Sequence, residues 1–164
     1  MTDVRARYEF TDKSGDYYRL ALELAALLAD ERDLMANAAN TAAFLFDALP
    51  ELNWVGFYFL KDNELVVGPF QGKPACVRIA LGAGVCGTAA AQERTVVVPD
   101  VHEFPGHIAC DANSRSEIVV PLKLDGALLG VLDLDSPRLG RFDDADRLGI
   151  EKLAAIFVDS LATA

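Results

Sequence analysis

Residues 53–70, NWVGFYFLKDNELVVGPF, decide the fold, because the hydrophobic period of the chain changes here to two. The apolar segments 53–60 and 64–70 flank Lys61-Asp62-Asn63, a turn signal, and predict a β-hairpin. Alternation along the first strand places Trp54 and Tyr58 on the same face. Aromatic side chains on a strand are usually core, but a sole Trp beside Gly56 also suits the wall of a small ligand pocket.

The rest of the chain contains further strands between helical segments. Helices are predicted over residues 16–33 and 33–50 and again after Asp143, which can cap the last helix with Asp146 three residues on. A glycine-rich turn over 82–87 precedes a short helix over 88–92. Four more strands are predicted, over residues 75–81, 95–100, 117–124 and 127–135. This order predicts an α+β fold, a largely antiparallel sheet with helices on one face.

Length and composition indicate one soluble cytoplasmic domain. The 164 residues contain no linker or repeat, so one domain is predicted over 1–164, with residues 1–14 loosely held. Apolar residues make up 52%, yet no apolar run approaches the ~20 residues of a membrane span. The net charge of −10 disfavours nucleic acid as a partner.

Three cysteines, Cys76, Cys86 and Cys110, lie in one short part of the chain. Cys86 lies at the predicted mouth of a helix, where the helix dipole lowers the pKa of a thiol. Cys110 lies in an irregular, loop-like segment, and Cys76 opens a predicted strand. Each alone fits a small buried side chain, whereas together they suit a redox cycle in which one thiol attacks and another resolves it. The spacing His102-x4-His107-x2-Cys110 is no zinc signature, and no metal is predicted.

Three carboxyl groups are a second candidate for chemistry. Asp133 and Asp135 are two residues apart on a predicted strand and share a face, and Glu117 begins the strand before it. If the two strands are neighbours, the three carboxyls line one concavity, where crowding raises their pKa values and lets one act as an acid. The alternative is that these acids are only the solvated ends of strands.

Several motifs resemble the free methionine-(R)-sulfoxide reductases, which are built on a GAF domain. The most specific are GPFQGKPACVRI (68–79) and GHIACDA-x-SRSEIVVPL (106–122), and the resemblance extends from about Tyr8 to Leu161. It implies a six-stranded antiparallel sheet with helices packed on one face and a ligand pocket on the other. It also implies reduction of the free amino acid, without a cofactor, by an enzyme that thioredoxin recycles and that is a homodimer.

The resemblance also assigns roles to residues. It implies that Cys110 attacks and that Cys76 or Cys86 resolves the oxidised thiol. From the residues alone, either thiol could attack: the helix dipole favours Cys86, whereas the exposed loop and the nearby Glu117 favour Cys110. The substrate would lie against Trp54 and Tyr58, with its sulfoxide oxygen and amino group held by Glu117, Asp133 and Asp135.

Two other functions are consistent with the same sequence. One is a sensory GAF module that binds a cyclic nucleotide or another small metabolite. The other is a redox-sensing structural protein whose cysteines form a switch, which predicts a disulfide but no turnover of a sulfoxide.

Overall fold

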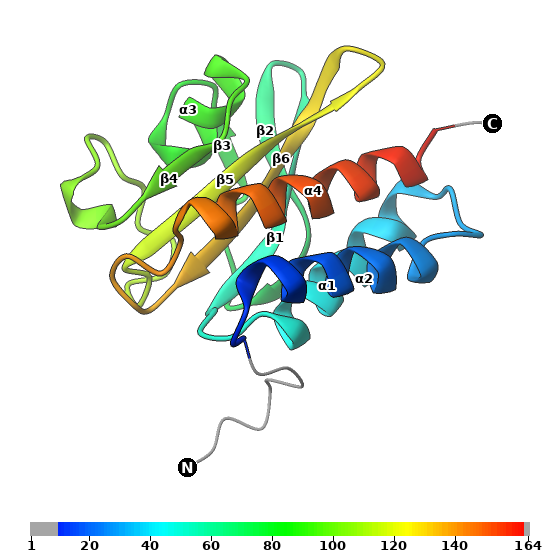
Figure 1. Ribbon diagram of the computed structural model, residues 1–164. Helices are drawn as coiled ribbons and strands as arrows, with labels where there is room; N and C mark the ends of the chain where they lie inside the picture. Colours follow the sequence, from blue (N-terminus) through cyan, green and yellow to red (C-terminus); the bar gives the residue numbers. More distant parts are fainter. Residues whose placement is uncertain (1–9, 163–164) are drawn as a thin grey trace.

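The computed structural model describes residues 10–162 and contains one sheet and four α-helices (Figure 1). Along the chain the elements are α1 (Lys13–Leu27), α2 (Leu34–Ala48), β1 (Trp54–Lys61), β2 (Glu64–Gly72), β3 (Arg78–Ala80), α3 (Gly84–Gln92), β4 (Val96–Val98), the 3-10 turn η1 (Val101–Glu103), β5 (Ser116–Leu124), β6 (Ala127–Ser136) and α4 (Asp144–Ser160). Most of the predicted loose segment, 1–14, lies outside the described residues, and α1 begins within it at Lys13.

The sheet has six antiparallel strands in the order β3-β2-β1-β6-β5-β4. The hairpin predicted over 53–70 is confirmed, with Asp62 and Asn63 both at positive φ in its turn. The second predicted hairpin turns at Asp125 and Gly126, also at positive φ. Strands β1 and β6 are neighbours at the centre of the sheet, so residues distant in sequence lie side by side there.

Helices α1, α2 and α4 cover one face of the sheet (Figure 1). Alternation along β1 sends Val55 and Phe57 into the core beneath them, where Phe57 packs against Phe157 of α4 with ring centroids 4.5 Å apart. The cap predicted for α4 is confirmed, because Asp143 and Asp146 each accept from the other's backbone N–H.

The predicted packing of the two N-terminal helices and the closing helix on one face of the sheet is confirmed, and the short helix α3 lies on the opposite face. Helix α3 contacts β3, β4, β5 and β6 and closes a second, smaller core. The predicted boundaries of α3 and β3 are wrong: α3 begins at Gly84 rather than after Gly87, and β3 is only Arg78–Ala80. Cys76 therefore lies in a loop before β3, and Cys86 lies inside the first turn of α3.

Among residues 10–162, no helix is long and apolar enough to span a membrane.

Candidate active site

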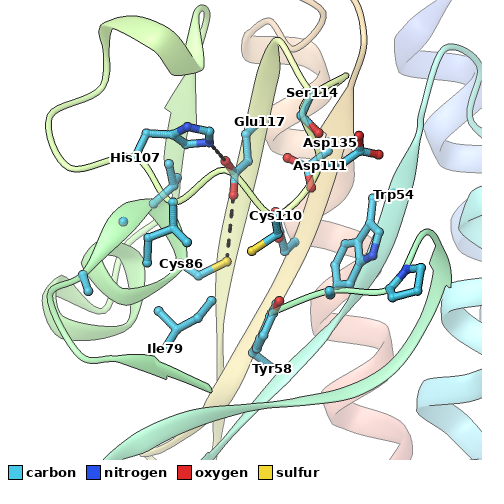
Figure 2. A pocket seen from close by; sticks show the side chains of 17 residues that line it. Trp54, Tyr58, Ile79, Cys86, His107, Cys110, Asp111, Ser114, Glu117 and Asp135 are labelled. Atoms are coloured by element: carbon cyan, nitrogen blue, oxygen red, sulfur yellow. Dashed lines mark hydrogen bonds and ion pairs between the residues drawn. The ribbon is translucent and has the colours of Figure 1, made fainter. Parts of the chain in front are cut away.

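A cavity opens on the α3 side of the sheet, between α3, the central strands and the loop before β5 (Figure 2). Strands β1, β5 and β6 supply its floor, and the first turn of α3 supplies one wall. Its lining includes seven of the eight predicted site residues: Trp54, Tyr58, Cys86, Cys110, Glu117, Asp133 and Asp135. The eighth, Cys76, is joined to Cys110.

The three carboxyl groups converge because β5 and β6 are neighbours. Glu117 on β5 pairs directly with Asp135 on β6, and Asp133 is two residues along the same face. Glu117 and Asp133 are 6% and 5% exposed. The predicted concavity of carboxyls is therefore present, and the alternative of solvated strand ends does not fit this burial.

Burial changes the proton affinity of these carboxyl groups. It raises the pKa of Glu117 and of Asp135 well above the usual range, and the charges of neighbouring acids add to both shifts. Burial also raises the pKa of Asp133, to about 6. No Lys or Arg is among the side chains that line the cavity. The cluster thus combines protonated carboxyls with a carboxylate at neutral pH.

Two of the three cysteines form a disulfide. Cys76 and Cys110 are joined with their Cα atoms 5.7 Å apart, and Cys110 is exposed while Cys76 is half-buried. Both lie in loops, where an external thiol can approach them.

Cys86 is the free thiol, and its environment contradicts the prediction of a lowered pKa. Its side chain is buried, and its sulfur lies 3.9 Å from Glu117 Oε1 (Figure 2). Burial, with the neighbouring acids Asp133 and Glu117 adding to it, raises the pKa of this thiol well above the usual range. The dipole argument considered the helix alone, and desolvation outweighs it here.

Trp54 and Tyr58 form an aromatic wall, as the alternation along β1 predicts (Figure 2). Their rings stack with centroids 5.9 Å apart, and Trp54 also stacks on Phe70. The Tyr58 hydroxyl donates to the backbone oxygen of Cys76 at 3.1 Å. Tyr58 therefore also anchors the loop that carries Cys76, one of the two disulfide cysteines.

Sequence reasoning missed a polar tether beside Cys110. Asn53 Nδ2 donates to Asp111 Oδ2 at 3.1 Å and to Ser114 Oγ at 2.9 Å. Asp111 also accepts from the backbone of Asn113 and lies 3.8 Å from Lys73 Nζ. The sequence Asp-Ala-Asn-Ser at 111–114 is typical of a turn and could have been recognised. Its contact with Asn53 depends on tertiary structure and has no local signal. The tether fixes the Cys110 loop against the start of β1.

The two histidines have different positions. His107 lines the cavity, with Nε2 3.8 Å from Glu117 Oε2. His102 lies on η1 beside Asp100 and does not line the cavity, so His102, His107 and Cys110 do not form one metal site. Among residues 10–162, a group whose spacing suits a metal ion is formed by Cys86, Glu117 and Asp133, which each offer one ligand atom within 4.8 Å of the other two.

The N-terminus of α3, which the sequence predicted beside Cys86, lies at the cavity. Ala83 precedes the helix and offers no side-chain cap to the N–H groups of the first turn. Ala83, Gly84, Val85 and Cys86 all line the cavity. Free backbone donors and the helix dipole make this end of α3 suited to an anionic group of a ligand.

Comparison with known proteins identifies the family. The GAF domain model matches residues 29–161. Free methionine-R-sulfoxide reductase from Escherichia coli K12 is 51% identical over 152 residues, which are 93% of this chain and 92% of that protein. The chain belongs to the free methionine-R-sulfoxide reductase family of GAF domains. The resemblance in the motifs and the expected six-stranded fold are thereby confirmed.

Two further proteins match nearly the full length of this chain. Protein YtsP from Bacillus subtilis is 54% identical over 153 residues, 92% of this chain and 94% of that protein. The X-ray structure of free methionine-R-sulfoxide reductase from Neisseria meningitidis in complex with its substrate superposes with a TM-score of 0.90 at 47% identity, covering 95% of this chain and 94% of that one. The family's fold therefore extends over the whole cavity described above.

Proposed function

We propose that this chain reduces free methionine-(R)-sulfoxide to methionine by thiol chemistry at the cavity described above. The observation that carries the proposal is the Cys76–Cys110 disulfide at a cavity lined by Glu117, Asp133 and Asp135. A reducible sulfur pair and proton-donating groups are the two requirements of the reaction. Family membership agrees with both, since a relative 51% identical carries the reductase name.

Cys110 attacks the sulfoxide as a thiolate. Its sulfur takes up the sulfoxide oxygen, one proton is delivered to that oxygen, methionine leaves, and Cys110 becomes a sulfenic acid. The Cys76 thiol then attacks the Cys110 sulfur, so that an S–S bond forms and the oxygen leaves as water. The assignment of Cys76 as the resolving thiol is supported by the disulfide. Cys86, the other candidate, is a free, buried thiol whose sulfur lies 3.9 Å from Glu117 Oε1.

Glu117 delivers the proton to the sulfoxide oxygen. Its raised pKa keeps it protonated near neutral pH, and a sulfoxide oxygen leaves poorly until it is protonated. Asp133, with a pKa of about 6, is a carboxylate at pH 7 and pairs with the ammonium group of the substrate. Asp135 lies opposite Glu117 in the same cluster. It helps to hold the sulfoxide oxygen and the ammonium group of the substrate.

Free methionine sulfoxide fits this cavity better than a residue within a peptide. The Trp54 and Tyr58 wall suits the methyl group, and the first turn of α3 offers N–H donors to the α-carboxylate. Buried acids require an ammonium group that a peptide bond does not provide. A cyclic nucleotide is disfavoured, since the described lining of the cavity carries three buried carboxyl groups and no Lys or Arg to offset the charge of a phosphate.

Thioredoxin recycles the enzyme in the cytoplasm by reducing the Cys76–Cys110 disulfide. The exposure of Cys110 supports attack by an external dithiol. We also propose that the protein is a homodimer. Large apolar side chains exposed on α1 and α4 support this: Tyr18, Leu22 and Leu148.

The test is methionine release from separated R and S sulfoxides, free and N-acetylated, with thioredoxin as reductant. We expect turnover of the free R form and not of the free S form. We also expect at least about a hundredfold preference for the free R form over its N-acetylated derivative, because the lost ion pair and the unpaired buried acid both weaken binding. Activity confined to the S form or to the acetylated substrate contradicts the proposal. Nucleotide binding without sulfoxide turnover would instead assign the sensory function.

A further inference from the structure

The proposed thiol chemistry uses Cys76 and Cys110 and leaves a third thiol in the same cavity without a part. Cys86 is 4% exposed, and its sulfur lies 3.9 Å from Glu117 Oε1 (Figure 2). His107, on the opposite side of Glu117, also has no assigned part. A thiol, an imidazole and carboxyl groups are the ligand types of a zinc site.

The spacing of these groups suits one metal ion. Ligand atoms of Cys86, Glu117 and Asp133 lie within 4.8 Å of one another. In a tetrahedral zinc site, bonds of about 2.0–2.3 Å place neighbouring ligand atoms roughly 3.3–3.7 Å apart. Rotamer adjustments of about 1 Å therefore bring the three atoms to bonding distance. His107 Nε2, 3.8 Å from Glu117 Oε2, is the nearest further ligand.

A second observation points to a cation at the same place. Asp133 is 5% exposed, and its buried Oδ1 has no hydrogen-bond partner among the described residues, while its carboxyl group interacts with the Glu117 carboxyl and the Cys86 thiol. A buried carboxylate oxygen without a partner costs free energy until a donor or cation reaches it. The cavity lining itself contains no Lys or Arg to neutralise it. The ammonium group of the substrate pairs with Asp133 during turnover, but this ion pair does not involve the Cys86 thiol beside it.

We propose that Cys86, Glu117 and Asp133 form a site for a thiolate-binding divalent cation of the Zn²⁺ type, which inhibits the enzyme by excluding substrate. The cation binds as an inhibitor and takes no part in the reduction. It replaces the Cys86 thiol proton and any carboxyl protons, which pass to solvent. A sulfur ligand selects Zn²⁺ or Co²⁺ over Mg²⁺ and Ca²⁺, which prefer oxygen ligands. Binding of the cation does not depend on the proposed function, whereas the claim that it excludes substrate rests on that function.

The test is a Co²⁺ titration of the oxidised protein, in which Cys86 is the one thiol left. We expect one equivalent of Co²⁺ to bind with a thiolate-to-cobalt charge-transfer band in the near ultraviolet. Zn²⁺ removes the band, and excess Mg²⁺ does not. Since absorbance of the oxidised protein is measured, the result is independent of reductase activity.

The conservative variant Cys86→Ser should lack the band and bind Co²⁺ at least about tenfold more weakly. The control variant Glu64→Gln, at an exposed carboxyl group, should keep the band and the affinity of the wild type. In the wild type, excess free methionine should displace Co²⁺ more effectively than the same concentration of glycine, which chelates the cation through the same amino and carboxylate groups. Absence of the band, equal affinity in Cys86→Ser, or Co²⁺ binding that methionine leaves unchanged would each overturn the proposal.

Discussion

Glu117 on β5 and Asp135 on β6 stand directly opposite each other in the sheet, so carboxyl groups from two strands enter one buried cavity. Burial in this cavity raises the pKa of both carboxyl groups well above the usual range, and the charge of Asp133 adds to both shifts. A protonated carboxyl beside a thiol is what sulfoxide reduction needs, and the first predictions concern these acids.

Replacing Glu117 by Gln removes the proposed proton donor while keeping the shape of the side chain. We expect kcat/KM for free methionine-(R)-sulfoxide to fall by about 10²–10⁴-fold, the usual contribution of a general acid. Binding of methionine, the product, should change far less, because no proton transfer is involved. Glu64→Gln, an exposed carboxyl on β2, is the matched control. A Glu117→Gln enzyme within threefold of wild type would assign the proton to another group.

Asp133 makes the stability of the protein depend on pH. Its pKa is about 6 in the folded protein against an ordinary value of 3.8, so the folded state binds more protons between these values. The Asp133 contribution to the free energy of unfolding is therefore most favourable below pH 4 and is lost as pH rises through about 6. As pH rises from 4 to about 6, the free energy of unfolding of the wild type should therefore fall relative to that of Asp133→Asn.

The measurement is urea denaturation of both proteins from pH 4 to pH 8. The difference between them reports the titration of Asp133 together with the change that its replacement makes to the pKa values of Glu117 and Asp135. A constant difference across this range would mean that Asp133 has an ordinary pKa in the folded protein.

Much of this site follows from sequence, because strand periodicity determines which side chains share a face. Alternation along residues 53–60 and 127–135 placed Trp54 with Tyr58 and Asp133 with Asp135. Their convergence with Glu117 also required β5 beside β6, which a short turn at Asp125 and Gly126 makes the expected arrangement.

Features that depend on tertiary burial did not follow from sequence. The position of α3 on the cavity face and the burial of Cys86 depend on packing, so the helix dipole alone gave the wrong direction for the pKa of that thiol. The contact of Asn53 with Asp111 joins residues far apart in the chain, and no local pattern marks it.

Tyr58 links the aromatic wall to the redox pair, because its hydroxyl donates to the Cys76 backbone at 3.1 Å. Tyr58→Phe removes one hydrogen bond, worth about 1 kcal/mol, while keeping the ring. We expect disulfide formation after the first chemical step to slow by about fivefold, since the Cys76 loop is held less firmly. Trapping the Cys110 sulfenic acid with a dimedone-type reagent measures this rate. Equal trapping in both proteins would show that the hydroxyl does not position Cys76.

The central claim is that Cys110 attacks and Cys76 resolves, and single-turnover release of methionine from the reduced protein tests it most directly. Without added reductant, wild type, Cys76→Ser and Cys86→Ser should each release about one equivalent of methionine, and Cys110→Ser should release none. With thioredoxin present, Cys86→Ser should continue to turn over, whereas Cys76→Ser should stop after the first equivalent. A burst of methionine from Cys110→Ser would contradict the account.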